Sequence, residues 1–306
     1  MTLQKSKILV VGSSNTDMVV LTDHLPHPGE TVLGGDFKMG PGGKGANQAV
    51  IAKRLGGNVR FVCKVGNDIF GNNSIEQYKK EGLLSEDILR SDKPSGVALI
   101  PVDKKGENSI IVASGANGDF STKDVEGIRH LLESCNILLL QLEIPIPSVL
   151  KAAEIGSKAG AMVILNPAPA ASLPEEIFQY ISLFIPNETE LSSFSGMNVK
   201  DSESAKKAAA VMRRKGVKDI IVTMGSSGSL ICSGEKTTLI SARKVKAIDT
   251  TGAGDTFCAG LCVGLSEGKT LTEAAVFATA ASSIAVQRLG AQEAAPYRKE
   301  VDLILK

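Results

Sequence analysis

Short apolar runs alternate with helix-like segments along most of this 306-residue chain. The first run, Lys7–Val11, is apolar at consecutive positions and ends at Gly12, as expected of a strand buried on both faces. Strands that alternate with helices fold through right-handed crossovers into a mainly parallel sheet flanked by helices on both faces. The pattern therefore predicts an α/β fold. The other predicted strands are Val59–Val65, Ile137–Leu142, Met162–Leu165, Leu183–Ile185 and Ile220–Met224, and the predicted helices are Asn47–Leu55, Ser74–Glu81, Pro147–Ala159, Ser202–Lys215, Thr256–Leu265 and Ala274–Val286.

Two segments interrupt this alternation, because each holds strand-like pieces without a helix between them. The pieces are Asp17–Thr22 with Thr31–Lys38, and Val97–Val102 with Ser109–Ala113. They predict a small antiparallel β-sheet above the carboxyl edge of the main sheet, where α/β folds bind ligands. Such a sheet would act as a lid and could pair with a second copy of the chain, giving a homodimer. The expected domains are a large α/β domain (1–14, 40–94 and 115–306) and a lid (15–39 and 95–114).

The charge balance excludes several kinds of partner. Lys and Arg number 34 against 33 Asp and Glu, so no nucleic-acid or anionic-membrane partner is expected.

No apolar run approaches the roughly 18 residues of a membrane helix. The polar start Met1–Lys7 predicts no signal peptide. Five cysteines without a C-x-x-C pair favour reduced thiols and a cytoplasmic location.

The segment Asp249–Phe257 carries the strongest chemical signal. Gly252 and Gly254 allow close approach of a ligand to the backbone, and a helical pattern follows them. The amides at such a helix start bind anions and suit the charge that develops on a transferring phosphoryl group. Asp255, in the first helical turn, can take a proton from a hydroxyl nucleophile. The plainer alternative is a helix cap after a glycine turn.

The segment Gly40–Gln48 is a glycine run that opens a helix and contains Lys44 and Asn47. Backbone amides, a cation and an amide side chain together suit a small polar ligand. The segment also fits G-x-G-x-x-G, which keeps a nicotinamide-dependent dehydrogenase as an alternative. That fingerprint is weak here, since it does not follow the first strand.

Two further segments follow predicted strands. Asn15 and Asp17 point the same way from an extended chain and suit the vicinal hydroxyls of a sugar, although an Asx turn is equally compatible. Asn187 and Glu190 share a face if a helix begins there. They can hold hydrated Mg²⁺ or form a capping box, and the two roles are compatible.

Taken together, these segments resemble the ribokinase-like (PfkB-type) family of carbohydrate kinases from Gly12 to Tyr297. The family signatures are present as 42–49 (GGKGANQA) and 249–257 (DTTGAGDTF), and 12–17, 28–31, 141–143, 165–170 and 186–190 resemble further family segments. The resemblance implies a mainly parallel sheet with helices on both faces, a small β-sheet lid, and ATP-dependent phosphorylation of D-ribose at O5. It also implies Mg²⁺ and an activating K⁺.

The same resemblance implies a role for individual residues. Asp255 would be the general base, and Gly252, Ala253 and Gly254 would form the anion hole. The sugar would be held by Asn15, Asp17, Gly43, Lys44, Asn47 and Glu143, and the nucleotide by Asn187, Thr223, Gly225, Gly228, Gly254 and Thr279. Glu190 would organise the water shell of Mg²⁺. The K⁺ would contact Asp249, carbonyl groups of Thr251, Ala285, Arg288 and Gly290, and position 294, which is often Ser in the family and is Ala294 here.

Within this reading, Asn15 and Asp17 favour a sugar with both hydroxyls over 2-deoxyribose, because a site built around a hydroxyl discriminates against its absence. Kinases for 2-deoxyribose, another small sugar or a nucleoside remain alternatives. A catalytically silent sugar-binding protein on the same scaffold is the alternative from a different class.

Overall fold

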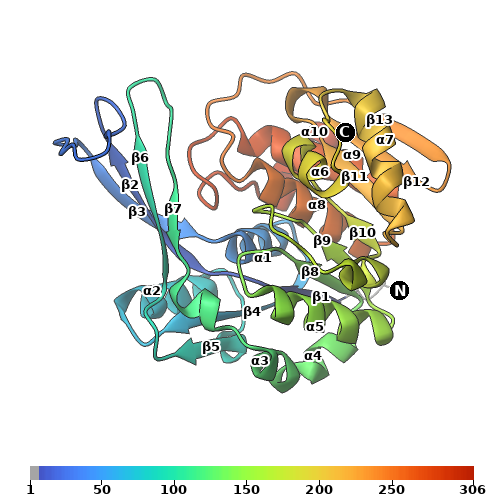
Figure 1. The fold of residues 1–306 in the computed structure, drawn as a ribbon, viewed down its shortest axis with the longest axis horizontal. Coiled ribbons are helices and arrows are strands. Elements are labelled where there is room, and N and C mark those ends of the chain that lie inside the picture. The colour runs from blue at the N-terminus through green and yellow to red at the C-terminus, as the bar shows by residue number, and fades with distance from the viewer. Residues whose placement is uncertain (1–6) are drawn as a thin grey trace.

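The computed structural model describes residues 7–306, which form two sheets (Figure 1). The larger sheet has the strand order β13–β12–β11–β10–β9–β8–β1–β4–β5. Its interior strand β1 (Lys7–Val11) pairs in parallel with β4 (Asn58–Gly66) and β8 (Ile137–Leu140). The antiparallel pairings β11–β12 and β12–β13 lie at one edge, so the prediction of a mainly parallel sheet is confirmed. The other strands are β5 (Ile88–Ser91), β9 (Met162–Leu165), β10 (Leu183–Phe184), β11 (Asp219–Thr223), β12 (Ser229–Ser233) and β13 (Lys236–Ile240).

Helices cover both faces of the large sheet. Ile8 and Val10 of β1 pack into one hydrophobic cluster, while Leu9 and Val11 pack into the other. Both faces of β1 are therefore buried, which explains its unbroken apolar run. One face is covered by α1 (Lys44–Arg54), α2 (Ile69–Lys80), α8 (Ala253–Ser266), α9 (Leu271–Ala285) and α10 (Arg298–Leu305), and the other by α3 (Thr122–Gly127), α4 (Arg129–Ser134), α5 (Ile146–Lys158), α6 (Glu188–Ser195) and α7 (Ser202–Arg214).

Some element boundaries differ from the predicted ones. The helix α2 begins at Ile69 rather than at Ser74, because Asp68 caps it by accepting a hydrogen bond from the Gly71 N–H at 2.8 Å. The strands β5, β12 and β13 lie outside the predicted runs. β5 and β13 are edge strands with exposed positions, so their apolar pattern is weak.

The smaller sheet, here called the lid, projects from the body in Figure 1 and has the order β3–β2–β6–β7. Its strands are β2 (Asn15–Leu21), β3 (Phe37–Gly42), β6 (Gly96–Val102) and β7 (Ile111–Ala113). β2–β3 and β6–β7 are antiparallel, whereas the central pair β2–β6 is parallel. That pair is parallel because β2 follows β1 and β6 follows β5, and both leave the same edge of the body. The strand expected at Thr31–Lys38 lies instead at Phe37–Gly42, where Gly42 pairs with Asn15.

Two chain-wide expectations concern location. Within residues 7–306, no helix is long and apolar enough to cross a membrane. All five cysteines are buried and unpaired. The predicted polar start of the chain lies, up to residue 6, outside the described residues.

Candidate active site

Several predicted site residues follow neighbouring strands at the carboxyl edge of the large sheet. Asn15 and Asp17 lie on β2, directly after β1, and Glu143 follows β8. Asn187 follows β10 and forms a parallel β-bridge with Thr223 at the end of β11. The strand order separates these two groups, so one side of the edge carries the predicted sugar residues and the other the predicted nucleotide residues.

Asp255 lies in the first turn of α8 and is only 5% exposed. Neighbouring residues of α1 hold its two carboxylate oxygens. Asn47 donates its Nδ2–H to Oδ2 at 3.0 Å, and Gln48 donates its Nε2–H to Oδ1 at 2.9 Å. An acceptor of two such bonds matches an ionised carboxylate, which has no proton to donate.

Outer amides fix the orientation of these two donors. The carbonyl oxygen of Asn47 accepts a hydrogen bond from Gln292 at 2.9 Å, and that of Gln48 accepts one from Gln141 at 2.6 Å. Each inner amide must therefore turn its NH₂ group toward Asp255. Gln48 also donates to Asn166 Oδ1 at 3.0 Å, which ties the network to the end of β9.

The start of α8 supplies backbone donors beside Asp255. Gly252 caps the helix in the left-handed conformation (φ 72°). The N–H of Ala253 donates to the Thr250 carbonyl at 3.1 Å. Gly252 and Gly254 keep N–H groups without a protein partner among residues 7–306. Of the three predicted anion-hole amides, Ala253 is thus engaged within the loop in this structure.

The sugar side of the site is rich in carboxylates. The backbone N–H of Lys44 donates to Glu143 Oε2 at 2.9 Å, and the Ser13 hydroxyl donates to the same oxygen. Burial, together with the charges of Glu143, Glu293 and Asp255, raises the pKa of Asp17 to about 6.

Lys44 is the cation among these carboxylates. The charge of Asp255 raises the pKa of the Lys44 ammonium against the opposing effect of burial, and Glu143 and Glu190 add to that rise. The Lys44 side chain forms no ion pair within 4 Å among the described residues. The ammonium is therefore available to an anionic ligand beside Asp255.

On the nucleotide side, Asn187 and Glu190 form a reciprocal capping box at the start of α6. Asn187 Oδ1 accepts from the Glu190 N–H at 2.8 Å, and Glu190 Oε2 accepts from the Asn187 N–H at 2.9 Å. Gly225 and Gly228 flank the turn between β11 and β12, next to Thr223. Thr279 lies on α9, one turn before Ser282, whose hydroxyl donates to the Ala253 carbonyl at 3.1 Å. Of these residues, Thr279 is thus placed within one helical turn of a contact with the start of α8.

Glu190 fits the predicted role toward Mg²⁺. Its side chain is buried, and burial raises the pKa of its carboxyl, while the Asn187 N–H opposes the rise. Its Oε1 has no hydrogen-bond partner among residues 7–306. An oxygen of this kind could contact Mg²⁺ through water, which would match the preference of that ion for few protein carboxylates.

The segments predicted to hold K⁺ are adjacent. Asp249 accepts hydrogen bonds from the Thr251 N–H at 2.9 Å and from the Gly290 N–H at 2.8 Å. Burial raises the pKa of Asp249, but the Thr251 hydroxyl and these two N–H groups together outweigh it and lower that pKa. Carboxylate and carbonyl oxygens are hard donors that suit an alkali cation. The side chain of Ala294 is a buried methyl group, so this position can contribute only backbone atoms.

The sequence alone predicted no individual role for several residues that bond within the site, namely Ser13, Gln48, Gln141, Asn166, Gln292 and Asn117. Gln141 and Asn166 directly follow buried strands, and a polar residue at that position is a usable signal. Gln292 and Asn117 lie in irregular segments, and each joins the site through contacts more than 100 residues away in the sequence.

The fold, with a buried carboxylate in the first turn of α8 at the carboxyl edge of the sheet, is that of a kinase for small molecules. The chain belongs to the pfkB family of carbohydrate kinases, whose model matches residues 5–298.

Three relatives illustrate the similarity. Ribokinase of Haemophilus influenzae is 40% identical over 297 residues, which cover 97% of both chains. Deoxyribokinase of Salmonella typhi is 40% identical over 254 residues, covering 82% of each chain. The structure of Arabidopsis thaliana ribokinase complexed with ribose and ATP superposes with a TM-score of 0.92 at 36% identity, covering 99% of both chains.

Proposed function

We propose that this chain transfers the γ-phosphoryl group of ATP to O5 of D-ribose, giving D-ribose 5-phosphate and ADP. The observation that carries the proposal is the placement of Asp255, which is held by two amides between the sugar-side residues and the start of α8. The ribokinases among its relatives, one of them solved with ribose and ATP, support the choice of both substrates.

The sugar side binds and orients the acceptor. We assign Asn15, Asp17, Gly43, Lys44, Asn47 and Glu143 to this role. Asp17 offers acceptor oxygens to sugar hydroxyls once it is ionised, above its pKa of about 6. The lid above these residues excludes water, which would otherwise compete with the sugar as the phosphoryl acceptor.

The reaction then requires one proton transfer and charge stabilisation. Asp255 takes the proton of the O5 hydroxyl as that oxygen attacks the γ-phosphorus and the bond to the β-phosphate oxygen breaks. Gly252, Ala253 and Gly254 supply amides for the developing negative charge. For Ala253 this requires release of its bond to Thr250.

Asn187, Thr223, Gly225, Gly228, Gly254 and Thr279 line the proposed nucleotide site. Glu190 would hold Mg²⁺ through water, and bound Mg²⁺ would neutralise phosphate charge. Asp249 and carbonyls of Thr251, Ala285, Arg288 and Gly290, with the backbone of Ala294, would hold K⁺. Such an ion would fix the loop that begins α8.

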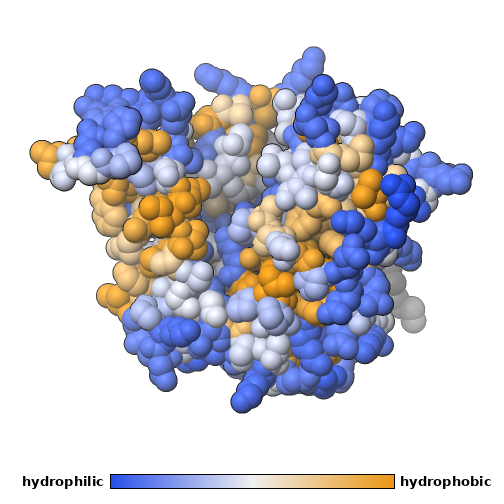
Figure 2. Space-filling model, in the orientation of Figure 1, coloured by the Kyte–Doolittle hydropathy of each residue, from blue (hydrophilic) through white to orange (hydrophobic). Residues whose placement is uncertain are grey.

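The lid also suggests an assembly. Cross-strand register places Met39, Met18, Leu99 and Ile111 in one row, on the face opposite to Asp17. Met39, Leu99 and Ile111 are 58%, 46% and 63% exposed, and Figure 2 shows apolar residues gathered on the lid. We propose that this face pairs with a second copy in a homodimer, since apolar surface of this kind marks interaction sites.

Two further proposals concern location and domain division. A cytoplasmic location is proposed from the five unpaired cysteines. The division of the chain into a lid (15–39 and 95–114) and a body is also retained as a proposal.

A kinase for 2-deoxyribose is the second candidate, because the deoxyribokinase relative is as similar in identity as the ribokinase relative. One assay separates the two. ADP release is measured with ATP, Mg²⁺ and either D-ribose or 2-deoxyribose, in KCl or NaCl. Turnover that is fastest on ribose supports the proposal. Turnover on 2-deoxyribose alone would identify 2-deoxyribose as the acceptor instead. No turnover on either sugar would refute a pentose kinase.

A further inference from the structure

Asn117 connects the base of the lid to the body. It lies in the short 3₁₀ helix η2 (Gly115–Asp119), which follows the last lid strand, and it is 1% exposed. Its Oδ1 accepts from the Ser14 N–H at 2.9 Å, and its Nδ2 donates to the Ser14 carbonyl at 3.0 Å and to Asn15 Oδ1 at 2.7 Å. The Asn117 amide thus bonds both backbone groups of Ser14, as a neighbouring strand would, and it also bonds the side chain of Asn15.

These bonds fix the polarity of the Asn15 side chain. Because Asn117 Oδ1 takes the Ser14 N–H, the NH₂ group of Asn117 must face Asn15. Asn15 therefore presents its carbonyl oxygen to Asn117 and turns its own NH₂ group away. That NH₂ group has no partner among residues 7–306.

Packing fixes where the two amide groups lie. A Cβ atom at Gly96 would lie 2.2 Å from Asn117 Nδ2 and 2.3 Å from Asn15 Oδ1. The two amides are therefore in close contact with the bare backbone at the root of β6, so the plane of each amide is held and only a half-turn that exchanges its oxygen and NH₂ group fits the same space.

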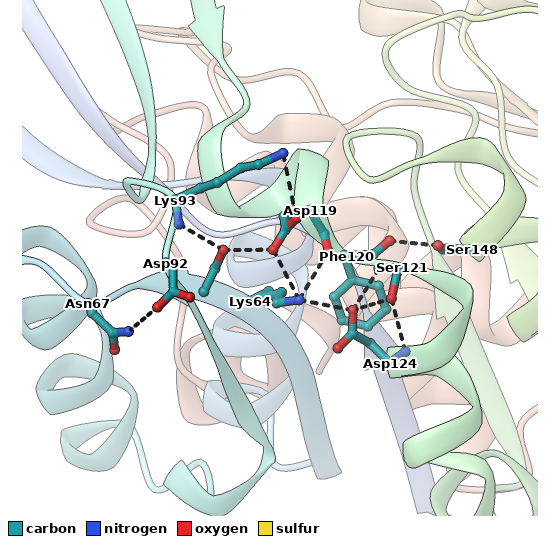
Figure 3. Close-up of polar contacts among 10 residues, drawn as sticks. Lys64, Asn67, Asp92, Lys93, Asp119, Phe120, Ser121, Asp124 and Ser148 are labelled. Atoms are coloured by element: carbon teal, nitrogen blue, oxygen red, sulfur yellow. Dashed lines mark hydrogen bonds and ion pairs between the residues drawn. The ribbon is translucent and has the colours of Figure 1, made fainter.

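The segment that carries Asn117 is anchored to the body (Figure 3). Lys64, on β4, donates from Nζ to the Asp119 carbonyl at 3.0 Å and to Asp124 Oδ2 at 3.0 Å. The Ser91 hydroxyl donates to Asp119 Oδ2 at 2.8 Å. Asn117 thus takes its position from the body of the molecule, although it contacts the first lid residue.

We propose that Asn117 is a specificity-determining positioning residue, which holds Asn15 so that only its NH₂ group faces the acceptor sugar. Asn15 then offers a donor and Asp17 offers acceptor oxygens, a complementary pair for two vicinal hydroxyls. A sugar that lacks one hydroxyl leaves one of these polar groups unpaired, which disfavours its binding. The inference rests on the proposed function and extends it to the choice between ribose and 2-deoxyribose.

The test is the substitution Asn117→Asp. The new carboxylate has no donor, so Asn15 must turn its NH₂ group toward residue 117 and its carbonyl toward the sugar. We expect KM for ribose to rise about tenfold with a smaller change for 2-deoxyribose, so that the preference between the two sugars narrows. KM for ATP and kcat on ribose should stay near the wild-type values. Asn136→Asp is the matched control, because within residues 7–306 the Asn136 side chain bonds only through its Oδ1, as acceptor for the Lys7 N–H at 2.9 Å, and an aspartate retains that bond.

Circular dichroism establishes whether each variant folds. If Asn117→Asp does not fold, Asn117→Ser replaces it, because the short hydroxyl cannot restrain Asn15 and the same narrowing is expected. A wild-type preference in a folded variant at position 117 overturns the inference while leaving the proposed function intact. Wild-type protein that phosphorylates neither pentose overturns the proposed function itself, so the two failures are distinguishable.

Discussion

Gln48 holds Asp255: the Nε2–H of Gln48 donates to Oδ1 of the carboxylate at 2.9 Å. The two residues are 207 positions apart and come from different helices, α1 and α8. Since Gln48 is itself oriented by Gln141, the direction in which Asp255 can accept a proton is set by an amide at the end of β8. The predicted effects of substitutions in this site follow from such contacts.

Asp255→Asn tests the base directly. The amide cannot accept the O5 proton, so kcat should fall by about 10³-fold while ribose and ATP still bind. Steady-state kinetics and calorimetric binding of both ligands provide the measurement. Asp201→Asn, at an exposed helix cap that asparagine also fills well, controls for the same chemical change. Near-normal turnover of Asp255→Asn would exclude Asp255 as the base.

Gln48→Met tests whether the hydrogen bond from Gln48 positions Asp255 for catalysis. The variant keeps the side-chain length but loses the bond to Asp255, so kcat should fall roughly tenfold with little change in KM for either substrate. A rise in KM at constant kcat would instead place Gln48 in substrate binding.

Asp17→Asn tests the cost of a buried carboxylate. The pKa of Asp17 is raised from 3.8 to about 6, so the folded state binds more protons between these values and the free energy of unfolding falls as pH rises through them. The variant should therefore be more stable than wild type above pH 6, by roughly 1–3 kcal/mol, and equally stable near pH 4. Urea unfolding at pH 4.5, 6 and 7.5 measures the difference, and a constant difference across that range would contradict the assignment. Ribose affinity should fall at all pH values above 6.

Asp249→Asn tests the cation loop. The amide cannot accept from both the Thr251 and the Gly290 N–H groups as the carboxylate does, and it carries no charge. Stimulation by KCl over NaCl should disappear, together with any K⁺-specific rise in melting temperature. Thr251→Ser retains the backbone carbonyl and the hydroxyl that bonds Asp249, and it should respond to K⁺ like wild type. If Asp249→Asn still responds to K⁺, the activating ion binds at another site.

Leu99→Glu tests the proposed dimer. A charge in the exposed row of Met39, Leu99 and Ile111 should separate the subunits, as measured by sedimentation at micromolar concentration. The control for an added surface charge is Leu303→Glu, since Leu303 lies on α10 and is 68% exposed. A wild-type monomer would refute the proposed interface outright.

The sequence was most informative where a local pattern had one physical cause. The apolar run of β1 predicted a strand buried on both faces, and the glycines before Asp255 predicted a helix start that presents a carboxylate. The position of β3 was not accessible in this way, because it is set by pairing with β2 in the register Asn15 to Gly42. Asn117 and Gln292 lie in irregular segments, so no periodicity identifies contacts that only the folded chain creates.

The junction between β3 and α1 is a single residue long. β3 ends at Gly42, α1 begins at Lys44, and Gly43 between them has φ 89° and lies so close to Asn15 that a Cβ would stand 2.8 Å from its nitrogen. The lid strand β3 and the helix that donates to Asp255 are therefore one continuous piece of chain, joined only by Gly43. Any displacement of β3 would therefore either bend the chain at Gly43 or shift Asn47 and Gln48, the two residues that donate to Asp255, so the backbone joins the position of the lid to the setting of the proposed base.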